Sequence, residues 1–346
     1  MLSHAWVEAY VSHLMPSGSE FRCAMAFSGD RLAGVLPLEV RALPGSGGRI
    51  CAAQTPYHAH SPNGDVLAVP AGREETVPML LLAAANALPG CRELALRGAV
   101  SGSATGADGC RPAARLRSMS VPRGFGSYLE TTGEWAHYHA RLSKNFRANL
   151  RKAEHRAVQA GPRRVCVLRN AEAGEAFLDG FLTLEASGWK GREGSAIQQN
   201  PSLKAFYGRM IRNAMAAGWL EGHLLEIGKT PVAAHLGLRL GRRLVLLKIA
   251  YDETRSDLSP GVLLFRDIAE AAFADPATDE INCLTDMEWH RPWRMNRRAY
   301  ADLRYFPRTF AGSLLGAAPR YLIGFAKALA NRRLKAVGPA PRASDP

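Results

Sequence analysis

The sequence predicts a mixed α/β protein (α and β elements with mixed sheets) of two domains, and three observations support this prediction. The chain has 346 residues, which is more than one hydrophobic core usually organises. Hydrophobic residues make up 47% and charged residues 22%, which is the composition of a globular protein. In the second half, the expected strands lead directly into helices, an order typical of α/β folds.

The first third predicts short strands and loops around one helix. Two strands flank Ser28-Gly29-Asp30, a turn of the Gly/Asp type, and Pro89-Gly90 ends the helix. The expected elements are strands at 21–27, 31–41, 49–53 and 93–97, a helix at 74–88, and a flexible Gly/Ser-rich loop at 101–112.

A second unit begins near Phe125 and shows clearer periodicity. Apolar residues at helical spacing predict a long helix that ends at Gly161-Pro162. A three-stranded meander then leads through a polar connector into a further helix. The expected elements are helices at 135–159, 171–187, 202–217 and 261–274, strands at 164–168, 220–227, 232–240, 243–251 and 281–284, and the connector at 252–259.

Cysteine usage and the lack of leader or membrane patterns favour a cytoplasmic protein. The six cysteines are scattered without a CxxC pair, which indicates reduced structural thiols and neither disulfides nor a metal site. The first ten residues show no basic region followed by an apolar run, so no signal peptide is expected. No apolar stretch approaches the roughly 20 residues that span a bilayer.

The formal charge of +13 favours anionic partners such as nucleotide cofactors, nucleic acid, sugar phosphates or an acidic membrane surface. Some large enzyme classes are disfavoured, because the sequence lacks a GxGxxG after the first strand, GxxxxGK[ST], HExxH and GxSxG. Rossmann dehydrogenases, P-loop enzymes, zincins and ordinary α/β-hydrolases are therefore not expected.

The junction between the 243–251 strand and the 261–274 helix predicts an anion site. A helix N-terminus offers unpaired N–H groups, Pro260 suits its first turn, and Gly261 allows a ligand to approach the backbone. Lys248 interrupts an otherwise apolar strand, and Tyr251 and Asp252 stand where that strand ends. The alternatives are a loop capped by Ser259 and a lysine that snorkels to the sheet margin.

The stretch from His139 to Arg169 contains nine Lys or Arg residues against the single acid Glu154. Lys144, Arg147 and Arg151 share a helix face. This face could hold CoA phosphates, an anionic acceptor or RNA, or it could simply be solvated.

Two further segments combine aromatic and titratable groups. Glu185 precedes a loop that presents Trp189 and Lys190, and such a loop is more suited to ligand contact than a core is. His290 stands in a cluster of acids and indoles at 286–293. Either segment could supply a general base, because Glu and His are the usual proton acceptors.

Together these residues resemble a known family. KIAYDE at 248–253 followed by SPGVLL at 259–264 is similar to the CelD-like branch of the GNAT acyltransferases, named for a protein of bacterial cellulose biosynthesis. LEASGWKG at 184–191, PVAA at 231–234, the basic start at 142–152, and LAGVLPL at 32–38 fit the same pattern. The chain lacks the Q/RxxGxG/A phosphate loop of simple GNAT enzymes. It also has Trp289-His290 where relatives often show Tyr-Lys.

The resemblance implies tandem GNAT-like domains related to the FemAB transferases. We expect a degenerate N-terminal domain at 1–124, an acyltransferase domain at 125–312, and a basic amphipathic helix with a disordered tail at 313–346. That helix either packs on the domain or contacts an anionic membrane surface.

The expected function is direct acyl transfer, with acetyl-CoA or another acyl-CoA as cosubstrate and an amine or hydroxyl as acceptor. The pathway would be envelope polysaccharide or natural-product biosynthesis. The candidate proton acceptors are Glu185, Asp252 and His290. The candidate cofactor contacts are Lys248, Ser259, Pro260, Gly261 and Val262. The candidate substrate contacts are Trp189, Lys190, Tyr251 and Arg147. The alternatives are FemAB-like aminoacyl transfer from charged tRNA and a non-catalytic GNAT scaffold.

Overall fold

The structure is a computed structural model that describes residues 3–60, 64–100, 115–169 and 171–319. The loop expected at 101–112 and most of the tail expected at 313–346 lie outside these residues. No helix in the described ranges is long and apolar enough to cross a bilayer.

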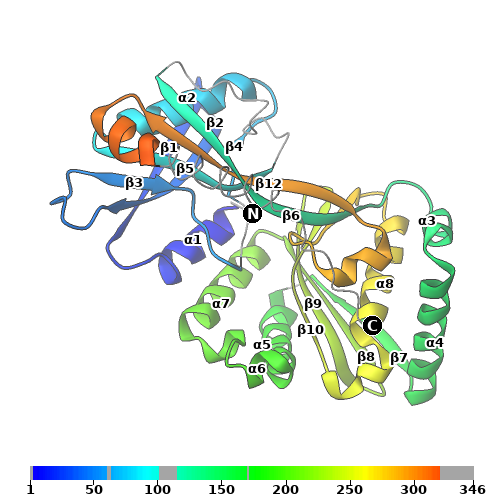
Figure 1. The fold of residues 1–346 in the computed structure, drawn as a ribbon. Helices are drawn as coiled ribbons and strands as arrows, with labels where there is room; N and C mark the ends of the chain where they lie inside the picture. Colours follow the sequence, from blue (N-terminus) through cyan, green and yellow to red (C-terminus); the bar gives the residue numbers. More distant parts are fainter. Residues whose placement is uncertain (1–2, 61–63, 101–114, 170, 320–346) are drawn as a thin grey trace, which may run out of the picture.

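The N-terminal half consists of a helix, a meander, a crossover helix and two further strands (Figure 1). Most of the expected elements are found there, with bounds shifted by a few residues. Helix α1 and the long strand β6 were not expected. The elements are α1 (His4–His13), β1 (Ser19–Ser28), β2 (Arg31–Ala42), β3 (Cys51–Gln54), β4 (Leu67–Ala68), α2 (Arg73–Asn86), β5 (Cys91–Val100) and β6 (Leu116–Glu130).

The C-terminal half repeats this plan with more helices. Its helices are α3 (Trp135–Arg141), α4 (Lys144–Ala160), α5 (Ala171–Ser187), α6 (Trp189–Arg192), α7 (Pro201–Ala216) and α8 (Pro260–Ala274). Its strands are β7 (Arg163–Leu168), β8 (Leu220–Ile227), β9 (Thr230–Leu240), β10 (Arg243–Tyr251), β11 (Glu280–Asn282) and β12 (Asn296–Pro307). Short turns are η1 (Ile197–Gln199), η2 (Glu253–Leu258), η3 (Glu288–Trp293) and the π-helical η4 (Ala311–Ala317).

The helix expected at 135–159 is two helices, so this prediction was wrong in its extent. Leu142 adopts an extended conformation and ends α3. Ser143 then caps α4, because its hydroxyl accepts a hydrogen bond from the Phe146 N–H at 3.1 Å. Because this cap gives a free N–H group in the first turn of α4 an acceptor, it favours the start of a new helix at this position. The apolar periodicity of the sequence nevertheless continues from α3 into α4.

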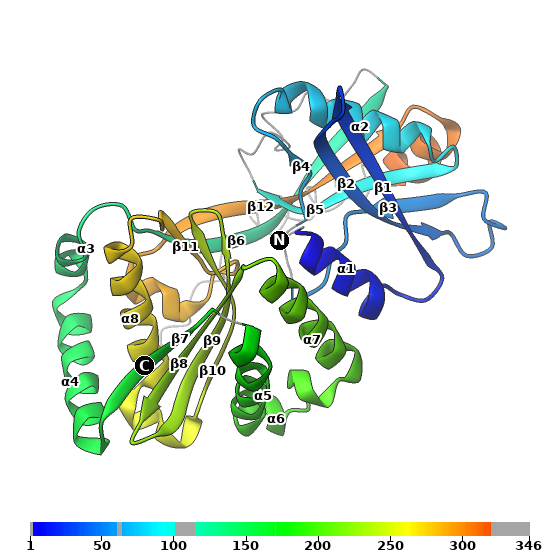
Figure 2. The same cartoon turned by 180° about the vertical axis from the view of Figure 1, so that it is seen from behind.

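The strands form one mixed sheet, with β4 attached beside β2. In each half an antiparallel meander (β1-β2-β3 or β8-β9-β10) is followed by a helix (α2 or α8) and a strand parallel to the last meander strand (β5 or β11). The final strands are exchanged: β6 pairs with β11 of the C-terminal half, and β12 pairs with β5 of the N-terminal half. The fold is therefore tandem, and β6 and β12 run side by side between the two lobes (Figures 1 and 2).

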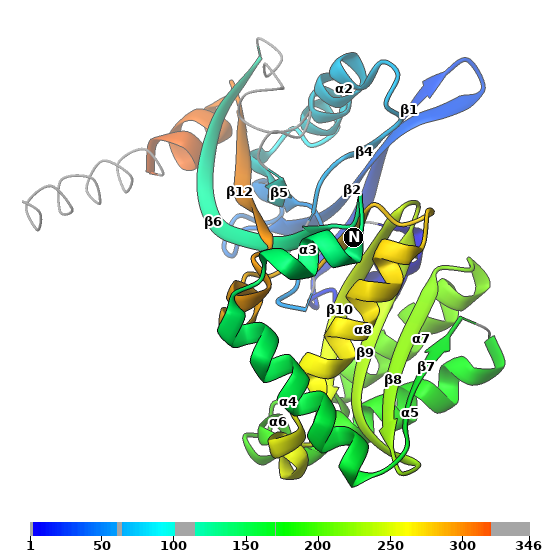
Figure 3. The ribbon, with the colours of Figure 1, turned by 90° about the vertical axis from the view of Figure 1, so that its right-hand side faces the viewer.

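The position expected as a domain boundary, between residues 124 and 125, falls within β6. This strand crosses from one lobe to the other, as Figure 3 shows.

Helices cover both faces of the C-terminal sheet. One face packs against α8 and α4, in a core that includes Leu244, Leu263 and Phe265. The other face packs against α5 and α7. Helix α1 joins this second core from the N-terminal half, because Trp6 and Tyr10 pack with Phe206 of α7. This shared core fixes the N-terminal half against α7.

Candidate active site

Strand β10 runs past the end of its parallel neighbour and leaves a free edge. It pairs with β9 from Arg243 to Tyr251 but with β11 only from Arg243 to Val245. On the β11 side, residues 246–251 therefore have no ladder partner among the described strands. The N–H and C=O groups of such an edge are available to a ligand that can pair like a strand.

A β-bulge interrupts β10 at the point where this free edge begins. Leu246 pairs with Gly237 of β9 and Lys248 pairs with the next residue, Leu236, so Leu247 is an extra residue. Side chains alternate between the faces of a strand, and one inserted residue reverses the alternation beyond it.

The bulge turns Lys248 to the α5/α7 face of the sheet. Before the bulge, Leu246 packs in the α8 core, and without an insertion Lys248 would lie on that same face. Beyond the bulge, Ile249 faces Gly261 at the start of α8, and Ala250 packs in the α5/α7 core. The two faces at the end of β10 therefore carry different chemistry.

On the α8 face, a cavity of about 300 Å³ opens at the N-terminus of α8. Four of the predicted cofactor contacts line it together with the predicted substrate contact Tyr251. The lining residues are Ile249, Tyr251, Ser256, Ser259, Pro260, Gly261, Val262 and Trp289. The structure thus brings these predicted residues to one cavity.

The first turn of α8 suits an anion. Ser259 precedes the helix in the left-handed conformation, with φ 52°, and Pro260 occupies the first turn. No acidic residue stands in that turn. A Cβ atom at Gly261 would lie 3.4 Å from Ile249 Cδ1 and 3.6 Å from Tyr251 Cδ1, so alanine fits there but a longer side chain enters the cavity. The free N–H groups and the dipole of a helix N-terminus attract phosphate.

On the other side of Tyr251, a narrow crevice of about 30 Å³ contains Glu185, Trp189 and Lys190, with Gly188 beside them. The buried Glu185 carboxylate accepts hydrogen bonds from Lys190 Nζ at 2.8 Å and from the Ile197 N–H at 3.0 Å. Both oxygens are thereby occupied, so the geometry makes Glu185 a group that positions Lys190.

Lys248 lies near this pair and near a loop of the N-terminal half. Burial lowers the pKa of Lys248 to about 8. The charge of Lys190 adds to this effect and that of Glu185 opposes it. Lys248 has no hydrogen-bond or ion-pair partner among the described residues. Its side chain therefore presents an amine whose charge is only partly balanced.

The N-terminal loop contributes two histidines that sequence reasoning missed. Their rings stack edge to face, with centroids 5.2 Å apart, and His60 Nδ1 lies 3.0 Å from the hydroxyl of Tyr207 in α7. Burial, followed by the charge of Lys248, lowers the pKa of both His58 and His60, that of His60 to about 3. Both rings are therefore neutral near pH 7. Only the packing of α1 and this loop on α7 brings them here, and no local motif could have indicated it.

The other two candidate proton acceptors have structural partners. One Asp252 oxygen accepts from the N–H and the hydroxyl of Thr254, at 2.9 and 2.7 Å, and so caps η2. The buried His290 ring accepts from the Met287 N–H through Nδ1 at 3.1 Å. Burial lowers the pKa of His290 to about 4, so it is neutral near pH 7. Its neighbour Trp289, rather than His290 itself, lines the cavity.

Arg147 lies near the start of α4, beside His139 of α3, and it lines neither the cavity nor the crevice. The other end of α4 comes closer to the cavity. Arg156 Nε donates to the Asp257 carbonyl at 2.7 Å, and Asp257 belongs to η2, which leads directly into α8. Helix α4 therefore brings positive charge to the approach of the cavity through its second half.

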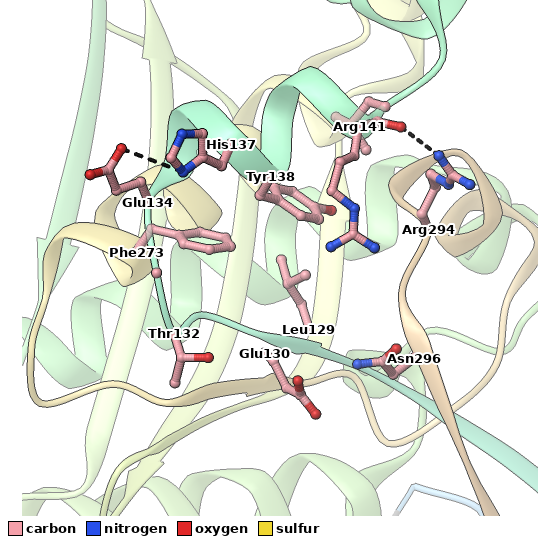
Figure 4. A pocket seen from close by; sticks show the side chains of 12 residues that line it. Leu129, Glu130, Thr132, Glu134, His137, Tyr138, Arg141, Phe273, Arg294 and Asn296 are labelled. Carbon is pink, nitrogen blue, oxygen red and sulfur yellow. Dashed lines mark hydrogen bonds and ion pairs between the residues drawn. The ribbon is translucent and has the colours of Figure 1, made fainter.

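A separate polar cavity of about 230 Å³ lies at the opposite end of α8 (Figure 4). Glu130, His137, Arg141 and Arg294 line it, and Phe273, near the last residue of α8, forms part of its wall. Phe273 is twelve positions after Gly261 in the same helix, which corresponds to roughly 18 Å at 1.5 Å per residue. This cavity is therefore distinct from the site at the carboxyl end of β10.

Comparison with known families gives a match in the C-terminal half. Residues 144–314 match the family described as acetyltransferase (GNAT) domain. The matched region, called the GNAT domain below, contains β10 and the whole of α8, so the cavity and the crevice lie within it. The CelD-like branch stays a prediction. Comparison with curated proteins gives no match.

Several solved structures share the fold over most of the chain. FemX is 11% identical, with a TM-score of 0.59 over 86% of this chain and 90% of that chain. A conserved protein of unknown function from Bacteroides thetaiotaomicron is 14% identical, with a TM-score of 0.52 over 82% and 86%. The C-terminal domain (DUF2156) of a putative lysylphosphatidylglycerol synthetase from Agrobacterium fabrum is 14% identical, with a TM-score of 0.51 over 89% and 93%. At these identities the likeness concerns the fold alone.

Proposed function

We propose that the GNAT domain transfers an acyl group from acyl-CoA to an amine or hydroxyl acceptor. The observation that carries this proposal is the cavity at the N-terminus of α8, which opens beside the free edge of β10. Here the N-terminus of α8, which suits an anion, lies beside backbone N–H and C=O groups of β10 that have no ladder partner among the described strands. This arrangement matches a donor that has a pyrophosphate at one end and an amide-containing arm at the other.

In this arrangement the donor pyrophosphate lies against the backbone at Pro260 and Gly261. The arm follows the free edge of β10, and its amides pair with backbone groups of residues 246–251. Arg156 and the other basic residues of α4 add a favourable field for the phosphates. The thioester carbonyl then lies near the bulge, where the strand gives access to its other face.

The acceptor approaches from the α5/α7 face, where Lys248 and Lys190 lie. Its nitrogen or oxygen attacks the thioester carbon, the C–S bond breaks, and CoA leaves as the thiol once it has gained a proton. Lys248 in its neutral form takes the proton that the acceptor loses, because a pKa of about 8 leaves part of this amine neutral near pH 7 to 8. Backbone N–H groups at the bulge stabilise the oxyanion.

Calorimetric titration with acetyl-CoA tests the donor site. Wild-type protein and Gly261→Ala should bind with similar affinity, because a Cβ fits at this position. Gly261→Glu should bind at least about 100-fold more weakly, because its side chain enters the cavity with a negative charge. A folded wild type that binds neither acetyl-CoA nor longer acyl-CoAs would refute the proposal.

A second candidate function is aminoacyl transfer from charged tRNA. It is favoured by the exposed basic side chains of α4, among them Lys144, Arg151 and Lys152, and by the formal charge of +13. Filter binding of charged tRNA at increasing salt distinguishes it, because contacts with phosphates give a steep salt dependence. Specific tRNA binding without acyl-CoA binding would favour this candidate.

The third candidate is a GNAT scaffold without catalysis. The engaged carboxylates of Glu185 and Asp252 are compatible with it. Acyl-CoA binding that Gly261→Glu removes would speak against it, and turnover of any acceptor would exclude it.

A further inference from the structure

The N-terminal half contains a pair of cysteines that the acyltransfer proposal does not use. Cys51 is the first residue of β3, Cys91 is the first residue of β5, and the two are directly paired in the parallel ladder. Neighbouring strands lie about 4.8 Å apart. This spacing falls within the roughly 4.4–6.8 Å between Cα atoms that a disulfide requires.

The two thiols differ in their surroundings. Cys91 is fully buried, and its Sγ lies 3.1 Å from the carbonyl oxygen of Glu93. Cys51 is partly exposed and therefore open to a small oxidant. A hydrogen bond from Cys91 lowers the pKa of Cys51. The same contact, followed by burial, raises the pKa of Cys91. Cys51 is thus the thiol that more readily becomes a thiolate nucleophile.

The other described cysteines have no such neighbour. Cys23 pairs with Pro37, and Cys166 pairs with Leu224. Cys283 is buried, and burial raises its pKa. Within the described strands, Cys51 and Cys91 are the two cysteines that face each other across a ladder. Ordinary packing explains a single buried thiol, but it does not require this pairing.

We propose that Cys51 and Cys91 are a redox-active pair that a peroxide converts to a disulfide. The Cys51 thiolate attacks one peroxide oxygen, the O–O bond breaks, and Cys51 becomes a sulfenic acid while the other oxygen leaves as water or alcohol. The Cys91 sulfur then attacks the Cys51 sulfur, the S–O bond breaks, and water leaves as the S–S bond forms. The two thiols lose two electrons in total, and the peroxide accepts them.

The disulfide would join the start of β3 to the start of β5. The closed loop contains β4 and α2, so oxidation would tie the crossover helix and both parallel strands together at one end. A reductant would release them. The pair therefore gives the N-terminal half a covalent link that depends on the redox state.

Thiol counting and peptide mapping on the full chain test the proposal. Reduced protein is treated with hydrogen peroxide, alkylated and digested with trypsin without reductant. Cleavage after Arg49, Arg73 and Arg92 places Cys51 in peptide 50–73 and Cys91 in peptide 74–92. We expect two of the six thiols to become resistant to alkylation, the two peptides to appear linked, and dithiothreitol to reverse both changes.

Variants separate the roles of the two thiols. Cys91→Ser should lose the linked peptide and leave Cys51 open to dimedone, which traps a sulfenic acid. Cys166→Ser, a matched control at another partly buried thiol, should behave like the wild type. Absence of the 50–73/74–92 link in folded wild type would overturn the proposal. So would a bond from either cysteine to Cys110, or an equal yield of the link in urea-unfolded protein.

Discussion

The two halves share one strand order, but among the described strands the last meander strand extends beyond its parallel neighbour only in the C-terminal half. In the N-terminal half, all four residues of β3 pair with β5. In the C-terminal half, β10 has nine residues and pairs with β11 over only three of them, so six residues, one of them the bulged Leu247, extend beyond the parallel ladder. The length of one strand relative to its neighbour therefore decides whether the sheet opens for a ligand.

The crossover helices show the same contrast. Helix α2 begins with Glu74 and Glu75 in its first turn, which favours the helix dipole but repels an anion. Helix α8 begins with Pro260 and Gly261 and has no acid in that turn. A duplicated fold thus retains its topology in both halves, whereas the proposed anion binding depends on a few residues of α8 that α2 lacks.

The largest expected effect concerns the exchanged strand β12. The buried Asp302 carboxylate accepts from the Gly98 N–H at 3.0 Å and lies 3.1 Å from Arg97 Nε and from Arg123 Nε, so it joins β5, β6 and β12. Asp302→Ala leaves the buried Gly98 N–H without this acceptor and removes both ion pairs of the buried carboxylate, so it should lower the free energy of unfolding by about 3 kcal/mol.

Urea denaturation measures this loss. Asp279→Asn, which removes an exposed pair with Arg242, should lower the free energy of unfolding far less. Equal losses in the two variants would show that the exchanged strand adds no special stability to the N-terminal half.

The next effect concerns Lys248, which lies where β10 extends beyond its parallel neighbour. The corresponding strand of the N-terminal half, β3, has no such extension. Lys248→Met removes the proposed proton acceptor and should lower kcat by about 100-fold. In the wild type, kcat should rise with pH through about 8, because the neutral amine is the active form and the pKa of Lys248 is lowered to about 8. In the variant this rise should be absent.

Measurement of kcat from pH 6 to 9 checks both the loss of about 100-fold and the pH dependence. Lys152→Met, a change at an exposed lysine, is the control. An unchanged pH profile in Lys248→Met would assign the proton transfer to another group.

The smallest effect concerns the buried carboxylate of Glu221 in strand β8. Burial alone would raise the pKa of Glu221, but hydrogen bonds from His223, Arg239 and Arg169 outweigh it and hold this pKa well below its usual value. Glu221→Gln should lower stability at pH 7 by about 2 kcal/mol.

This stability is present above the unfolded pKa of about 4.3 and is lost as pH falls toward the folded pKa. The difference between wild type and Glu221→Gln should therefore shrink progressively below pH 4.3. Urea midpoints from pH 7 to 2.5 measure it, with the exposed Glu288→Gln as the control. A constant difference would mean that the Glu221 charge contributes nothing.

The sequence predicted well the parts of the fold that local patterns determine. The meander at 220–251 and the helix from 260 follow from strand periodicity, Gly turns and Pro260, and the cavity residues Ser259 to Val262 came from the same junction. The exchanged strands were missed, since β6 contains Pro122 and Gly124 and its partners lie far away in the sequence.

The site was predictable only on its α8 face. The orientation of Lys248 depends on a bulge, which a run of apolar residues does not reveal. The histidines reach it through contacts between segments about 150 residues apart, such as His60 with Tyr207. Nor could the spacing of Cys51 and Cys91 indicate that they meet across a ladder.

The exchange of β6 and β12 also sets the order in which a growing chain can fold. Strand β5 ends at residue 100, but its partner β12 begins at residue 296. During synthesis one side of β5 therefore stays uncovered until residues 296–307 have left the ribosome. Such distant pairing slows folding, and it implies that neither lobe expressed by itself would complete its sheet.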